Sequence, residues 1–212
     1  MRVDIWSDVV CPWCYLGTRR FEEAVARLDG RDVEVVHRAF ELDPTVPPGG
    51  QDLAEYLARK FGGSQRVTAT RDRLARAASD IGLDFRWEGK RRVNTFDAHR
   101  LAAWALDVAG AEVQNDLHQR MFRAYFTDNL DLADHAVLAA LAGDAGLDAG
   151  RAAEVLASGA YADEVRADER RAGELDIHAV PTFVIEGRWA IPGAQDVDTF
   201  VELLARAAER LA

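Results

Sequence analysis

Two cysteines constrain this chain more than any other feature of its sequence. Cys11 and Cys14 are its only cysteines, and they are separated by Pro12 and Trp13. This spacing brings the two sulfurs within bonding distance when Cys11 opens a helix and Cys14 lies one turn further on. Pro12 suits the first helical turn, because its missing N–H would have no partner there. The free N–H groups and the positive end of such a helix favour an anion at Cys11.

The pair therefore predicts thiol–disulfide exchange, a reaction in which a thiolate is the nucleophile. We expect Cys11 to attack the substrate, and the deeper Cys14 to attack the resulting mixed disulfide and release the product. Two alternatives stay open. Half of a zinc site has the same spacing, but the sequence offers no second CxxC and no close pair of histidines, so no metal site is predicted. The other alternative is a pair of inert core cysteines.

Segments with β character lie at both ends of the chain. Val3–Trp6 is an expected strand, apolar residues recur at helical spacing from Pro12 to about Leu28, and a second β-rich run covers residues 33–40. Close to the C-terminus, β-rich runs on both sides of Gly187 predict an antiparallel hairpin. Asp196 is the expected cap of a final helix.

From Gln51 to about Leu175 the pattern is helical, without a convincing strand. The expected helices are Leu53–Phe61, Gln65–Ile81, Phe96–Ala109, Val113–Phe126, His135–Ala145, Arg151–Ala157 and Ala162–Leu175. The sequence therefore predicts an α/β, thioredoxin-like fold with a large all-helical insertion between a β-α-β half and a β-β-α half. We expect residues 1–48 and 178–212 to form the discontinuous thioredoxin-like domain, and residues 49–177 the inserted helical subdomain.

Charge and apolar patterning exclude several classes of partner. Asp and Glu outnumber Lys and Arg by 36 to 26, which gives a formal charge of −10, whereas nucleic-acid-binding surfaces are basic. No stretch approaches the roughly 20 apolar residues of a membrane span. The first residues show no pattern of a signal peptide. We expect a cytoplasmic protein without nucleic-acid or membrane partners, in which a disulfide is catalytic or transient.

A second motif follows the helical region: Val180 and Pro181 come directly before a β-rich run. A strand, CPWC at a helix start, a helical insertion, and VPTFVIEG followed by GRWAIPGAQ together resemble the DsbA family, and within it the FrnE-like branch. The segments that carry the resemblance are Asp8–Gly17, Asn94–Leu101 and Val180–Gln195. The resemblance extends over nearly the whole chain.

This resemblance implies that Pro181 is cis and packs against the Cys11–Cys14 pair, and that the backbone of Val180 offers an edge to an extended substrate. Members of the family oxidise, reduce or isomerise dithiols and disulfides, and some are linked to polyketide pathways. The secreted DsbA branch has His where this chain has Trp13, so strongly oxidising behaviour is not implied.

Residues near the two motifs receive further expected roles. Thioredoxin-like proteins hold a buried carboxylate below the second cysteine as a proton relay, and Asp4 and Asp8 are the candidates; for each, a solvated acid or a cap is the alternative. Trp13 is expected to shield the disulfide and contact apolar substrates. Asn94 and His99 lie in a segment that resembles the site-facing stretch of kappa-class glutathione transferases and chromene-carboxylate isomerases, and are candidate substrate-binding residues; ordinary helix capping is the alternative. His37, His118, His135 and His178 receive no role.

The favoured function is a thiol–disulfide oxidoreductase or isomerase that acts on protein or small dithiol substrates. Its only expected redox group is the Cys11–Cys14 disulfide, with glutathione as a potential co-substrate. One alternative is a glutathione-dependent transferase or isomerase of the kappa type, which carries Ser at the nucleophile position; the presence of both cysteines disfavours it. A redox-linked chaperone is the non-enzymatic alternative.

Overall fold

The computed structural model describes residues 1–28, 32–47, 49–61 and 64–211, without the side chains of residues 61–66. Its strands are β1 (Arg2–Ser7), β2 (Glu34–Ala39), β3 (Gln51–Asp52), β4 (Arg91–Arg92), β5 (Thr182–Ile185) and β6 (Trp189–Pro192). Its helices are α1 (Pro12–Ala26), α2 (Leu53–Phe61), α3 (Ser64–Ser79), α4 (Phe96–Ala109), α5 (Ala111–Phe126), α6 (His135–Asp144), α7 (Ala149–Ala157), α8 (Ala162–Glu174) and α9 (Val197–Leu211). This is the predicted thioredoxin-like α/β fold with a helical insertion.

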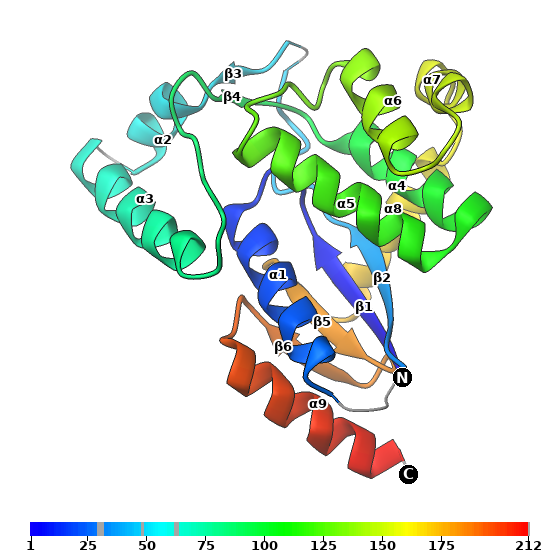
Figure 1. Cartoon of the computed structure of the whole chain (residues 1–212). Helices are drawn as coiled ribbons and strands as arrows, with labels where there is room; N and C mark the ends of the chain where they lie inside the picture. Colours follow the sequence, from blue (N-terminus) through cyan, green and yellow to red (C-terminus); the bar gives the residue numbers. More distant parts are fainter. Residues whose placement is uncertain (29–31, 48, 62–63, 212) are drawn as a thin grey trace.

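The central sheet has the strand order β2-β1-β5-β6 (Figure 1). β1 pairs in parallel with β2 and antiparallel with β5, so that Ile5 lies opposite both His37 and Phe183. Because parallel neighbours need a crossover, α1 connects β1 to β2. β5 and β6 form the predicted hairpin, in which Glu186 and Gly187 have φ values of 50° and 64°. Two successive positive φ angles are typical of the tight turn that matches the strand twist.

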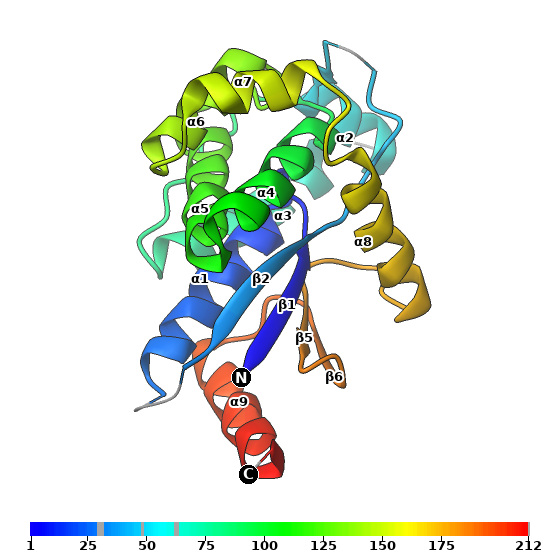
Figure 2. The same cartoon turned by 90° about the vertical axis from the view of Figure 1, so that its right-hand side faces the viewer.

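Side chains that alternate along the strands reach two different helical layers. On one face, Phe183 stacks on Phe21 of α1 at 5.0 Å between ring centroids, and Phe200 of α9 packs edge-on against Phe183. On the other face, Trp6 and Val184 belong to a cluster that includes residues of α8. Figure 2 shows α1 and α8 on opposite sides of the sheet. Each fully buried phenylalanine contributes on the order of 2 kcal/mol of stabilisation.

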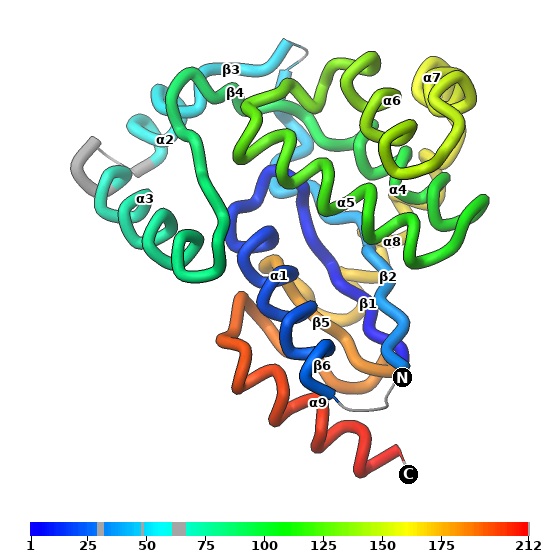
Figure 3. Tube along the Cα trace, in the orientation of Figure 1, coloured from blue at the N-terminus to red at the C-terminus, as the bar shows by residue number. Residues whose placement is uncertain are grey.

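Helices α4, α5, α6 and α7 lie over the end of the sheet where β1 leads into α1 (Figure 3). They form a second core, and α1 belongs to it through Tyr15, whose ring stacks on Phe122 of α5 at 5.1 Å and on Phe85 at 5.7 Å. Cys14 lies in the same core. The first turn of α1 is therefore held between the two parts of the molecule.

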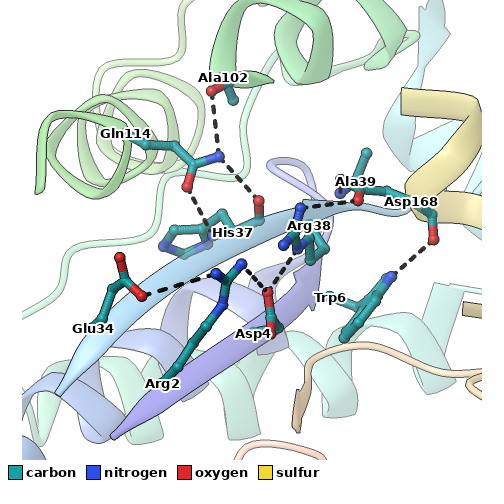
Figure 4. A network of polar contacts seen from close by, with 10 residues as sticks. All are labelled: Arg2, Asp4, Trp6, Glu34, His37, Arg38, Ala39, Ala102, Gln114 and Asp168. Carbon is teal, nitrogen blue, oxygen red and sulfur yellow. Dashed lines mark hydrogen bonds and ion pairs between the residues drawn. The ribbon is translucent and has the colours of Figure 1, made fainter. Parts of the chain in front are cut away.

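Polar groups of the insertion also cover the outer edge of β2, an edge strand whose backbone would otherwise be exposed. Gln114 of α5 accepts the N–H of His37 at 2.9 Å and donates to its carbonyl at 3.0 Å (Figure 4). Asp168 of α8 accepts the N–H of Ala39 at 3.1 Å, and its carbonyl accepts the indole N–H of Trp6 at 3.0 Å. These contacts fix the insertion against β1 and β2.

One prediction about the insertion is wrong in detail, because β3 and β4 pair antiparallel, with Gln51 opposite Arg92. Strands of two residues leave no alternating pattern that a sequence can reveal. The helices begin and end within two residues of their expected positions. The expected domain boundary at residue 48 lies outside the described residues, and the division of the chain into two domains stays a prediction.

A close approach at Gly17 of α1 provides a test of this packing. A Cβ atom there would lie 2.9 Å from Cγ of Pro181 and 3.2 Å from Cα of Ala194. We expect Gly17→Ala to lower the free energy of unfolding by about 1–3 kcal/mol, because the loop before β5 must move. Urea unfolding followed by tryptophan fluorescence measures the change.

The matched control is Gly173→Ala in α8, where an added Cβ meets no atom within 4 Å. This control should leave stability unchanged or raise it by up to about 1 kcal/mol, through helix propensity. Equal stabilities of the Gly17→Ala protein and the wild type would contradict the packing described here.

Candidate active site

Cys11 and Cys14 occupy the first turn of α1, directly after β1. Cys11 is the N-cap residue, Pro12 follows in the first turn, and the backbone N–H of Cys14 donates to the carbonyl of Cys11 at 3.0 Å. The N–H of Cys11 donates to the carbonyl of Asp8 at 3.0 Å, which closes the turn that leaves β1. Both cysteines are free thiols. The positive end of α1 therefore faces the position of Cys11, as the sequence predicts.

The two thiols have different surroundings. Cys14 is completely buried, and this burial, followed by its contact with the thiol of Cys11, raises the pKa of Cys14 well above its usual value. A backbone hydrogen bond from Asp8 to the Cys14 sulfur acts in the opposite direction. Trp13 between them is 39% exposed. Cys14 is therefore a protonated thiol, and it must lose its proton before it can act as a nucleophile.

The loop before β5 brings Val180 to the site. The Val180–Pro181 peptide bond is cis. The carbonyl of Val180 lies 3.9 Å from Sγ of Cys11. The motifs at the two ends of the sequence therefore meet at one place in the fold.

The two candidate carboxylates lie in different environments. Asp8 is 1% exposed, and its carboxylate accepts the N–H of Leu42 at 2.7 Å and the N–H of Val10 at 3.3 Å. Asp4 binds Arg38 at 2.7 Å, in the ion-pair network on β1 and β2 that Figure 4 shows. Of the two, Asp8 is the carboxylate whose charge acts on the thiol of Cys14.

The two candidate substrate-binding residues at the start of α4 and within it lie in different environments. Asn94 precedes the helix, where its side chain accepts the N–H of Phe96 at 2.9 Å and donates to Glu41 at 3.2 Å. His99 is 2% exposed, and its Nε2 lies 3.8 Å from Oδ1 of Asp8. His99 thus lies in the interior beside Asp8, whereas the side chain of Asn94 binds the backbone at the start of α4.

Sequence reasoning missed two buried histidines beside His99. His37 of β2 and His118 of α5 are 2% and 1% exposed, and their ring centroids lie 4.0 Å apart. Burial lowers the pKa of His37 to about 4, and burial together with the neighbouring histidines lowers the pKa of His118 well below its usual value. Their wide separation in sequence left no spacing signal.

A cavity of about 640 Å³, which we call the front cavity, opens beside the CPWC turn. It is bounded by Pro12 and Trp13, by residues of α2 and α3, and by apolar side chains such as Leu42, Trp87 and Phe126. Its size is that of pockets that take small molecules, and its walls are mainly apolar with a few polar groups. The exposed face of Trp13 thus borders a space in which a substrate can bind.

The described part of the chain brings no three His, Cys, Asp or Glu side chains together in a way that could hold a metal ion. Among the described helices, none has the length and apolar character needed to cross a membrane.

Comparisons with known proteins agree with this geometry. The family profile described as DSBA-like thioredoxin domain matches residues 2–205. The structure of a probable DsbA oxidoreductase, SCO1869 from Streptomyces coelicolor, superposes with a TM-score of 0.91 at 41% identity, over 99% of this chain and 90% of that one. The cytosolic disulfide reductase DsbM from Pseudomonas aeruginosa has the same fold, with a TM-score of 0.71 at 18% identity and full coverage of both chains. The protein YwbO of Bacillus subtilis is 27% identical over 97% of this chain and 96% of its own length.

The buried His37 predicts a dependence of stability on pH. Its pKa is about 4 in the folded protein and 6.5 without burial, so the unfolded chain binds the proton more tightly between these values. The stabilisation that its neutral ring contributes is complete above pH 6.5 and is lost as the pH falls toward 4, by up to about 3 kcal/mol.

Urea unfolding at a series of pH values between about 7.5 and 4.5 checks this slope. His37→Asn should flatten it, whereas His178→Gln, at an exposed position, should leave it unchanged. An unaltered slope in the His37→Asn protein would show that His37 does not titrate as its burial implies.

Proposed function

This chain belongs to the family of DSBA-like thioredoxin domains, and from that premise we propose that it is a thiol–disulfide oxidoreductase with Cys11 as nucleophile and Cys14 as resolving cysteine. One observation carries the proposal: Cys11 opens α1 while Cys14, in contact with it, is completely buried. Cys11 keeps 5% of its surface exposed and Cys14 none, so the outer sulfur is placed to meet a substrate first and the inner one to displace it. The contact between the two thiols also favours an internal disulfide over a mechanism that uses glutathione alone.

The reaction follows from this arrangement. The thiolate of Cys11 attacks one sulfur of a substrate disulfide, a mixed disulfide forms, and the other substrate sulfur leaves as a thiolate. Cys14 then attacks the sulfur of Cys11, the Cys11–Cys14 disulfide forms, and the second substrate sulfur leaves. The substrate has gained two electrons and the protein has lost them. The same steps in reverse oxidise a dithiol.

The surroundings of Cys11 support two modes of substrate binding. The front cavity and the exposed ring of Trp13 suit an apolar group attached to the reacting sulfur. The backbone at Val180, next to Sγ of Cys11, suits an extended peptide that adds as a strand. Protein and small-molecule dithiols are therefore both within the proposed substrate class.

We further propose that the protein works in the cytoplasm as a reductase or isomerase. A reducing pool of thiols keeps most dithiols reduced there, and the pair then returns to the reduced form after each turnover. The related fold of DsbM belongs to a cytosolic disulfide reductase, and one structure of DsbM contains glutathione. We propose glutathione as the co-substrate: two molecules reduce the Cys11–Cys14 disulfide and leave as glutathione disulfide.

Single replacements of the two cysteines test this function. Cys11→Ser should abolish insulin reduction and the oxidation of small dithiols, because no nucleophile remains at the helix start. Cys14→Ser should accumulate mixed disulfides with the substrate, because the second attack cannot occur. Non-reducing electrophoresis and mass spectrometry detect these adducts. Full activity of the Cys11→Ser protein would rule out the proposed function.

A further inference from the structure

Three of the five histidines lie buried between β2, α4 and α5. His37, His99 and His118 are each at most 2% exposed. The ring centroids of His37 and His118 lie 4.0 Å apart, and those of His118 and His99 lie 6.5 Å apart. An imidazole that is withdrawn from water loses hydration at a free-energy cost. A row of three such rings therefore points to a role beyond packing.

The row approaches the active site at Asp8. Nε2 of His99 lies 3.8 Å from Oδ1 of Asp8, and within the described residues this nitrogen has no hydrogen-bond partner. The charge of the Asp8 carboxylate also acts on the thiol of Cys14 and raises its pKa, while the backbone N–H of Asp8 donates to the Cys14 sulfur. A single residue thus lies between the resolving thiol and an imidazole with an unused ring nitrogen.

His99 also borders a second cavity, of about 600 Å³, between β2, α4, α5 and α8, which we call the rear cavity. His37 and His118 line it as well, together with polar residues that include Gln114. Asp8 lines the front cavity, and the two cavities have no described lining residue in common. The Asp8–His99 pair therefore crosses the wall that separates the two cavities.

We propose that Asp8 and His99 form a proton relay that carries the proton of the resolving Cys14 to the rear cavity. The proposal rests on the proposed function, in which Cys14 attacks the mixed disulfide. In that step a bond forms between the sulfurs of Cys14 and Cys11, and the bond between Cys11 and the substrate sulfur breaks. The substrate leaves as a thiolate, the Cys14 proton passes to the carboxylate of Asp8 and then to Nε2 of His99, and His99 releases a proton to the rear cavity.

A proton path to the rear cavity avoids the side of the site where the substrate binds. Cys14 is completely buried, and the front cavity lies beside Pro12 and Trp13 of the same turn. A substrate bound there excludes water from the reacting sulfurs. The relay lets the proton leave while the substrate still covers the front.

The titratable groups around His99 come from several segments of the chain. The titratable groups that act on it from the surrounding segments are Asp8 before α1, His37 of β2, Glu41 after β2, His118 of α5 and Asp168 of α8. Near pH 7 burial keeps His37 and His118 neutral. Of the three buried histidines, His99 is the one that faces the carboxylate of Asp8.

Stopped-flow reaction of the reduced protein with dithionitrobenzoate separates the two chemical steps. The attack of Cys11 releases a first coloured thiolate at a rate that depends on reagent concentration, and the attack of Cys14 releases a second at a rate that does not. His99→Gln is the test variant. His135→Gln is the matched control, because His135 is exposed and pairs with Asp97 on the surface.

In the wild type the second phase should be fast near neutral pH, because Asp8 and His99 accept the proton of Cys14 in turn. His99→Gln should slow the second phase about 100-fold near neutral pH, while the first phase is unchanged. In this variant the rate should rise at alkaline pH, where Cys14 ionises directly. His135→Gln should behave as the wild type.

Two results would overturn the relay: a second phase of wild-type rate in the His99→Gln protein, or equal slowing of both phases. Should His99→Gln fail to fold, His99→Asn decides in the same way. Failure of the proposed function gives a different result, because then the wild type shows no second phase, or Cys14→Ser retains it.

Discussion

The buried carboxylate of Asp8 is the interaction on which the geometry of the site depends. A carboxylate withdrawn from water is stable only when hydrogen bonds replace its hydration. Asp8 accepts one backbone N–H from Val10, before α1, and another from Leu42, after β2. These bonds join the two segments that leave adjacent strands, directly before the turn in which α1 begins. Cys11 becomes the N-cap residue, and Cys14 is placed in the interior.

The two parts of the fold contribute different components to this site. The thioredoxin-like half supplies the strand, the helix start and the loop at Val180, and with them the reacting sulfurs. The helical insertion supplies most of the walls of the front cavity, and His99 and His118 at the rear cavity. Gln114 and Asp168 fix the insertion to the edge of β2. The two cavities therefore keep a fixed position relative to the cysteines.

The parts of this structure that the sequence predicts are those with local signals. Helical spacing located the helices within two residues, and the hairpin followed from the β-rich runs that flank Gly187. The spacing of Cys11 and Cys14 indicated their roles. Contacts between distant segments left no such signal: the choice between Asp4 and Asp8 depends on where Arg38 and Leu42 lie. The histidine row also arises only when β2, α4 and α5 pack together.

The central claim is that Cys11 and Cys14 act as one redox couple. A titration of the protein in glutathione buffers, with alkylation of the remaining thiols and intact-mass analysis, tests it most directly. The account predicts that both thiols disappear together in a single two-electron transition to an internal disulfide. Independent oxidation of the two cysteines, with glutathione adducts on each and no internal disulfide, would contradict it.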